Sequence, residues 1–140
     1  MKFKYQKLPI GGYDSRKPLI PRPYIPVYLI GKNQRTGSPY YALLDSGADR
    51  VIFPRDLALE VGIKNFKSDG RHEPSIGIGN QTVDVYYHNL KLQILGDTKE
   101  LNTEVGFAES MAFPILGRSF FKHFKSVVFN ESKEEVELKV

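Results

Sequence analysis

Short runs of β-branched and aromatic residues, separated by glycine or proline, follow one another along most of the sequence. Val, Ile, Phe and Tyr together number 37, whereas Ala numbers only 5. Such side chains fit the pleated, half-buried surface of a β-sheet, and the 12 glycines and 9 prolines supply frequent turns. The sequence therefore predicts a mainly β protein.

The apolar and alternating runs indicate where the strands lie. Strands are expected at residues 25–31, 40–44, 72–78, 81–87, 90–94, 101–107, 127–129 and 136–140. The runs 72–78 and 81–87 meet at Gly79-Asn80, which predicts a hairpin. Residues 55–61 have helical spacing that Gly62 should end, and 118–124 is a second, short helical segment. The tail 136–140 has one apolar face, which can close a sheet of its own chain or pair with a second copy.

Positive charge is concentrated near the beginning of the chain. Residues 1–22 carry a local charge of +5, whereas the other 118 residues carry about −1. We expect residues 1–22 to form an extended, solvated basic arm and residues 23–140 to form one folded domain. We do not expect nucleic acid as a partner. If the arm does contact nucleic acid or an acidic protein, deleting it should abolish a salt-dependent binding.

Several function classes are excluded by what the sequence lacks. The chain has no cysteine, so it has no disulfide framework, thiol nucleophile or iron–sulfur cluster. The first ten residues contain no apolar signal-peptide core, and no apolar run approaches the ~18–20 residues that a membrane span requires. We therefore expect a cytoplasmic protein with no membrane partner. His72, His88 and His123 lack metal-ligand spacing, so we expect no metal and no cofactor.

One segment combines residue types that carry chemistry, the stretch Tyr41 to Ala48 that reads YALLDSGA. An apolar strand leads directly into Asp45, and a carboxylate is costly to bury unless it is hydrogen-bonded. Ser46 can donate a hydrogen bond, and Gly47 lets the backbone turn sharply and bring its N–H close to the acid. The same tripeptide is also compatible with a simple turn that ends a strand.

Two further motifs lie downstream of Asp45. Ser75 to Asn80 is punctuated by glycines, which suits a loop with few side chains. Phe113 to Arg118 is an apolar run that ends in Gly-Arg, just before the second helical segment. Taken in this order, the three motifs resemble the retropepsin-like aspartic protease family, whose cellular and prokaryotic members often carry Asp-Ser-Gly-Ala. The resemblance covers roughly residues 26–140.

The resemblance implies a retropepsin-like acid-protease β-barrel with a flap hairpin and one or two short helices. Asp45 matches the catalytic aspartate of the family, and Ser46 matches the hydroxyl residue that braces two active-site loops across subunits. Gly47 matches the glycine whose backbone contacts the carboxylate. The residues expected to support the active-site loop are Ser46, Gly47, Ala48, Asp49 and Arg118, of which Asp49 and Arg118 are expected to form an ion pair.

The flap matches the family only in outline. Its tip here is Gly-Asn, where other members have a Gly-Gly pair. The residues expected to form this substrate-binding flap are Ile76, Gly77, Ile78, Gly79 and Asn80.

Hydrolysis of a peptide without a metal or a covalent intermediate requires a base that activates water and an acid that protonates the carbonyl oxygen. Two carboxylates about 3 Å apart share one proton and supply both roles. The chain has a single Asp-Ser-Gly, since Asp14 and Asp69 lack either the glycine or the hydroxyl residue. The resemblance therefore implies a homodimer in which each copy contributes Asp45.

We predict from these motifs an aspartic endopeptidase that cleaves extended peptide or protein substrates, mainly at hydrophobic residues. The alternative is a catalytically weak or inactive retropepsin-like module that dimerises and holds peptides or partner proteins. The intact Asp45 to Gly47 motif favours the enzyme, because a binding module has no need of a buried acid.

Overall fold

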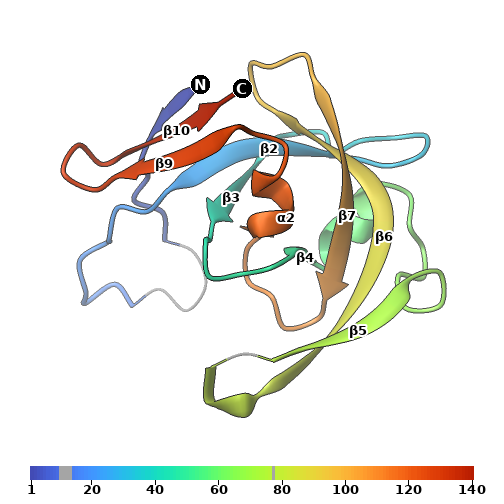
Figure 1. Cartoon of the computed structure of the whole chain (residues 1–140). Helices are drawn as coiled ribbons and strands as arrows, with labels where there is room; N and C mark the ends of the chain where they lie inside the picture. Colours follow the sequence, from blue (N-terminus) through green and yellow to red (C-terminus); the bar gives the residue numbers. More distant parts are fainter. Residues whose placement is uncertain (10–13, 77) are drawn as a thin grey trace.

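The computed structural model describes residues 1–9, 14–76 and 78–140. Its main sheet consists of β2 (Tyr24–Ile30), β3 (Tyr40–Leu44), β8 (Ile115–Leu116), β4 (Val51–Pro54), β7 (Glu100–Ala108), β6 (Thr82–Ile94) and β5 (Arg71–Ile76), in this spatial order. An additional pairing of β2 with β6 closes all strands of this sheet except β5 into a barrel. β5 continues the sheet outside the barrel, where it pairs with the first half of β6 (Figure 1). The prediction of a mainly β barrel is confirmed.

The core of the barrel consists of the apolar side chains that face inward. Along β2, Ile25, Val27 and Leu29 are fully buried, which is the alternation expected of a strand with one face toward the core. At the end of β6, Leu92 and Ile94 repeat this pattern against β2. The largest fully buried side chains of the chain are Phe53, Phe107, Phe120, Ile25, Leu29, Leu92, Ile94, Leu116 and Leu138.

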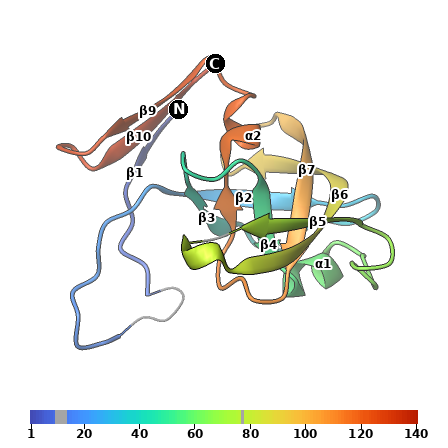
Figure 2. The ribbon, with the colours of Figure 1, turned by 60° about the horizontal axis from the view of Figure 1, so that its bottom comes forward.

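The predicted strands 81–87 and 90–94 are one continuous strand, β6. His88 and Asn89, which lie between the two runs, pair with Val105 and Glu104 of β7 and contain neither glycine nor proline to interrupt the ladder. The first half of β6 therefore belongs to the β5–β6 hairpin and its second half belongs to the barrel. Figure 1 shows the hairpin below the barrel, and in Figure 2, where the bottom of that view comes forward, β5 lies in front of the barrel strands.

Two strands of the barrel, β4 and β8, are absent from the sequence-based prediction. β4 is a four-residue apolar run that ends in proline, and β8 has only two residues. Neither is long enough to show the alternation of apolar and polar residues that identifies a strand. β8 nevertheless has a central position, because it pairs in parallel with β3 and antiparallel with β4. It thereby joins the strand that precedes the Asp-Ser-Gly motif to the strand that follows it.

Two short helices accompany the sheet, as predicted. α1 (Asp56–Glu60) lies within the predicted range 55–61, and Gly62 follows it with a φ of +84°, a left-handed conformation that glycine adopts without strain. α2 (Arg118–Phe121) is shorter than the predicted 118–124, because the N–H groups of His123 and Phe124 donate to carbonyls only three residues earlier. Across the part of the chain that the structure describes, no helix has the length and apolarity needed to cross a membrane.

The N-terminal and C-terminal segments form a second sheet, in the order β1 (Lys2–Lys4), β10 (Glu135–Lys139) and β9 (Ser126–Asn130). The side chains of Val136 and Leu138 on β10 are fully buried, whereas Val140 is exposed. In this structure the tail is thus a closing strand of its own chain. Figure 1 shows the two chain ends side by side at this sheet.

The expected arm over residues 1–22 is not solvated at its start. β1 pairs with β10, and Tyr5 is buried and donates a hydrogen bond from its hydroxyl to Glu131 at 2.7 Å. Gln6 and Arg22 form an antiparallel backbone bridge, so the chain on either side of this segment is also held by the fold. The difference arises because Phe3 and Tyr5 alternate with lysines, so that these few residues can pair as a strand despite their charge.

The loop that carries the Asp-Ser-Gly motif is held by backbone hydrogen bonds to the segment that contains β8. The N–H of Asp45 donates to the carbonyl of Leu116 at 3.0 Å, and the N–H of Arg118 donates to the carbonyl of Ala48 at 2.8 Å. Between them, the N–H of Gly117 donates to the carbonyl of Arg50 at 3.1 Å. A Cβ on Gly117 would lie 2.3 Å from that carbonyl oxygen and 2.6 Å from the oxygen of Ala48. Only glycine permits this approach of the two backbones.

We expect Gly117→Ala to lower the free energy of unfolding by about 1–3 kcal/mol or more, because the added methyl group collides with backbone atoms that have no room to move. Thermal and urea unfolding measure the effect. Gly37→Ala is the matched control, since nothing lies within 4 Å of a Cβ at Gly37. This control should change stability by less than about 1 kcal/mol. Equal unfolding curves for the two variants would show that the close approach at Gly117 is not required.

Candidate active site

Asp45 follows the last residue of β3 at the edge of the barrel. The N–H of Gly47 donates to its Oδ1 at 2.9 Å, as the sequence predicts. Asp45 is half-buried in the single chain, while Ser46 and Gly47 are exposed. The expectation of a buried carboxylate is therefore wrong for one isolated chain, because the loop is covered from the side of β8 only.

The predicted ion pair between Asp49 and Arg118 is confirmed, with 2.6 Å between Oδ1 of the aspartate and Nη2 of the arginine. Both side chains are largely exposed, 74% for Asp49 and 65% for Arg118. An ion pair this exposed contributes about 0–1 kcal/mol, since water screens it and two long side chains must be ordered. In the single chain, the loop is therefore held mainly by its backbone hydrogen bonds to the β8 segment.

Asp45 lines a cleft of about 1630 Å³ between the active-site loop, the β5–β6 hairpin and α2. Among the predicted site residues, those that line it are Asp45, Gly47, Ala48, Asp49, Ile76 and Arg118. The described residues Ser46, Gly79 and Asn80 do not line the cleft. Further apolar side chains that line it are Ile52, Pro74, Val83, Val85, Tyr87, Met111, Ile115 and Phe121. Such a surface suits hydrophobic side chains of a bound peptide.

The predicted hairpin at Gly79-Asn80 is confirmed. Ile76 at the end of β5 pairs with Thr82 at the start of β6, and η1 (Ile78–Asn80) forms the connection. Gly79 and Asn80 have φ of +79° and +61°, a left-handed conformation that glycine adopts without strain and asparagine adopts more readily than most other residues. Ile76 is 75% exposed, so the hairpin presents an apolar side chain near its tip. Gly77, another predicted flap residue, lies outside the described residues.

The three histidines lie apart from one another in the described chain, each with its own contact. Their partners are Asp84 for His72 at 2.8 Å, the Phe66 carbonyl for His88 at 2.8 Å and Thr103 for His123 at 3.1 Å. Within residues 1–9, 14–76 and 78–140, no group of three or more His, Asp or Glu side chains is arranged to hold a metal ion.

Sequence reasoning did not identify the charged residues beside the cleft. Arg50 and Glu73 both line it and contact each other, although 23 positions separate them in the chain. The sequence signal was the position of Arg50 directly after the Asp-Ser-Gly-Ala-Asp run. Its partner could not be predicted, because the contact depends on how the hairpin folds back toward the loop.

Comparisons with known proteins agree with this geometry. The family model described as "Aspartyl protease" matches residues 32–120, which include the active-site loop, the hairpin and Arg118. Among curated proteins, none matches the chain significantly. A solved structure with a similar fold is a retropepsin-like aspartic protease from Rickettsia conorii, with a TM-score of 0.59 and 16% identity over 81% of this chain and 78% of that one.

A second similar structure is the EIAV protease complexed with the inhibitor HBY-793, with a TM-score of 0.45 and 23% identity over 81% of this chain and 93% of that one. The barrel closed by β2 and β6, with its hairpin outside, is thus the retropepsin-like fold seen in the rickettsial structure. Since the family model spans both the loop that carries Asp45 and the segment that holds this loop, the chain belongs to the aspartyl protease family.

Proposed function

We propose that this chain is an aspartic endopeptidase that acts as a homodimer, in which Asp45 of each copy contributes to one site. The observation that carries the proposal is the charge pattern of the cleft. Three carboxylates line it, and two of them, Asp49 and Glu73, are bound by arginines. Within the described residues, Asp45 has no cationic partner and no second carboxylate that could share its proton. It is half of a two-carboxylate site.

The chemistry follows from bringing two such halves together. Two carboxylates in contact cannot both be ionised, so one proton is shared between them. The ionised carboxylate accepts a proton from a water molecule as this water attacks the peptide carbonyl carbon. The protonated carboxyl donates its proton to the carbonyl oxygen, which gives a tetrahedral diol. The carboxyl that took the proton from water then donates it to the amide nitrogen, and the C–N bond breaks to release the amine. A hydroxyl proton of the diol passes to the other carboxylate, so the pair again holds one shared proton. The Gly47 N–H supports these steps because it fixes the orientation of the Asp45 carboxylate.

The supporting roles of the remaining loop residues belong to the same proposal. The exposed Ser46 is available to hydrogen-bond to the loop of a second copy. Ala48 accepts the N–H of Arg118 through its carbonyl, and the Asp49–Arg118 pair adds a side-chain link between the loop and α2. Formation of a dimer over this region would shield the ion pair from water and strengthen it.

The cleft indicates the class of substrate. Its lining is mainly apolar and it extends from Asp45 to the β5–β6 hairpin, so an extended peptide with hydrophobic side chains fits it. We propose that residues 76–80 of this hairpin act as a flap that closes over the bound peptide and excludes water.

We expect Asp45→Asn to reduce peptide hydrolysis by at least about a hundredfold, because the amide cannot accept the proton of the attacking water. The substitution is nearly isosteric, so the melting temperature and the sedimentation of the protein should change little. Digestion of a peptide library by parent and variant, followed by mass spectrometry, provides the measurement. Activity of the parent should fall as the pH rises and the carboxylate pair loses its shared proton.

Equal cleavage by parent and variant would contradict the peptidase proposal, as would an activity that keeps increasing to alkaline pH. If neither protein cleaves but both bind the same peptides, the molecule is the binding module considered above.

A site shared between two copies makes activity depend on concentration. We expect specific activity to fall on dilution, once the chain concentration drops below the dissociation constant of the dimer. An activity dilution series with a small fluorogenic peptide, run beside sedimentation at the same concentrations, checks both changes together. A monomer whose specific activity does not change with concentration would contradict the homodimer.

A further inference from the structure

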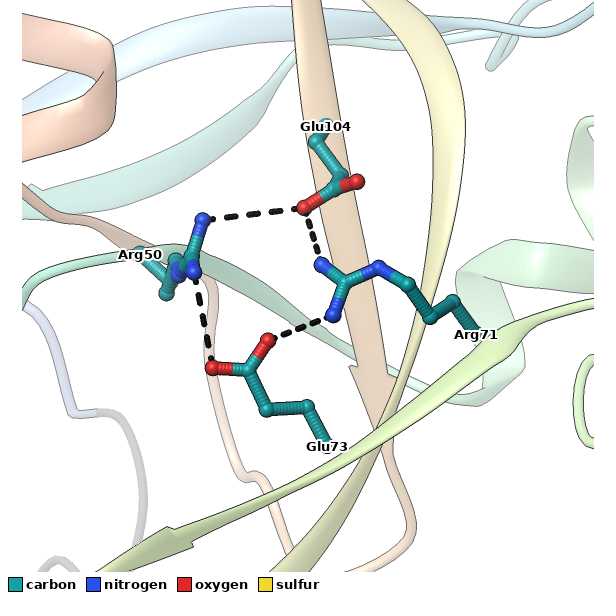
Figure 3. Close-up of polar contacts among 4 residues, drawn as sticks. All are labelled: Arg50, Arg71, Glu73 and Glu104. Atoms are coloured by element: carbon teal, nitrogen blue, oxygen red, sulfur yellow. Dashed lines mark hydrogen bonds and ion pairs between the residues drawn. The ribbon is translucent and has the colours of Figure 1, made fainter.

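Four charged side chains lie between the active-site loop and the β5–β6 hairpin: Arg50, Arg71, Glu73 and Glu104 (Figure 3). We propose that this charged cluster is a positioning device that holds the hairpin over the cleft, with Arg71 as its central residue. The inference rests on the proposed function, in which the hairpin closes over a bound peptide.

The contacts of the cluster form a closed ring of alternating charge. Arg71 donates to Glu73 at 2.6 Å through Nη1 and to Glu104 through Nη2. Arg50 approaches the same two carboxylates at longer range, 3.4 Å from Glu73 and 3.7 Å from Glu104. Each carboxylate thus lies between two guanidinium groups, and each guanidinium lies between two carboxylates. Arg71 makes the two short contacts, so its removal opens the ring most.

The cluster joins parts of the fold that the backbone connects only indirectly. β5 is the last strand of the sheet, and its ladder partner is β6. Arg71 on β5 lies opposite Tyr87 of β6, yet its side chain reaches Glu104 on β7, the next strand along. Arg50 directly precedes β4, at the end of the active-site loop. These side-chain contacts therefore connect β5 both to β7 of the barrel and to the end of the loop that carries Asp45.

Both arginines lie against the side chain of a buried aromatic residue, Tyr87. The guanidinium carbons of Arg71 and Arg50 lie 5.1 and 5.7 Å from the centre of the Tyr87 ring. Such cation–π contacts favour one orientation of each side chain. The ring has room there because its partner on β7 is Gly106, where a Cβ would lie 2.8 Å from Cε1 of Tyr87. The site is therefore shaped to hold both arginines in place.

The contacts with the arginines favour the charged form of Glu73. The hydrogen bond from Arg71 holds the pKa of Glu73 below its usual value, with Arg50 acting in the same direction. The stabilisation from Glu73 is therefore present above the ordinary glutamate pKa, and it is lost only as the pH falls through the lowered value in the folded protein. Burial raises the pKa of Tyr87 to about 12, so the ring beneath the arginines stays neutral.

Substitution of Arg71 tests the proposal. The cluster side chains are 34–51% exposed, so their pairs are individually weak and sensitive to salt. We expect Arg71→Ala to accelerate hydrogen exchange of the β5 amides roughly threefold to tenfold, while β2 amides in the barrel keep the parent rate. High salt should accelerate β5 exchange in the parent and have little effect in the variant.

Lys91→Ala is the matched control. Lys91 forms an ion pair with Glu100 at 3.1 Å on the same sheet, and its side chain is 48% exposed against 51% for Arg71. Its loss should leave β5 exchange unchanged. Equal β5 exchange in the two variants would overturn the proposal, because the charged cluster would then hold β5 no better than an ordinary surface ion pair does.

Kinetics separates positioning from general stability. A looser hairpin binds peptide less well but leaves the carboxylates in place, so KM should rise while kcat changes little. Faster β5 exchange with an unchanged KM would overturn the positioning role. If the parent shows no peptidase activity, the proposed function fails. The KM of the variant is then replaced by the dissociation constant of a bound peptide, which must be higher for the variant than for the parent.

Discussion

The close contact of two backbones at Gly117 is the constraint on which the site depends. The loop after β3 has to leave the barrel, expose a carboxylate and return to β4, and such a loop would be mobile on its own. Hydrogen bonds from Asp45, Gly117 and Arg118 fix it against the β8 segment. Because these bonds are made by the backbone, the side chains of the loop remain available for chemistry. The shape of the cleft, the proposed dimer and the position of Arg50 in the charged cluster all depend on a loop that is fixed in this way.

Much of this arrangement could be predicted from sequence, and the particular residues show why. The β2 alternation, the Gly79-Asn80 turn and the Asp45–Gly47 hydrogen bond are local, since periodicity or turn chemistry over a few residues specifies them. The Asp49–Arg118 pair is distant in the chain, and it was found only because the resemblance to a family supplied the pairing.

Features that depend on tertiary packing alone could not be predicted. β8 consists of two residues whose strand conformation depends on β3 and β4 on either side. β1 is not among the expected strands, because its lysines indicate a solvated segment, although Phe3 and Tyr5 alternate with them. The partners of Arg71 depend on the order of β5, β6 and β7 in the sheet. The half-exposure of Asp45 likewise reflects what covers the loop, which no local pattern encodes.

The central claim is that one site requires Asp45 from two chains, and subunit mixing measures this most directly. Asp45→Asn chains are added in increasing excess to a fixed amount of parent, at a total concentration that keeps all chains dimeric. If each site needs both carboxylates, random pairing leaves about one tenth of the parent activity at a ninefold excess, because nearly all parent chains then lie in mixed dimers. Activity that stays at the parent level throughout the titration would show that one chain carries a complete site, and would contradict the account.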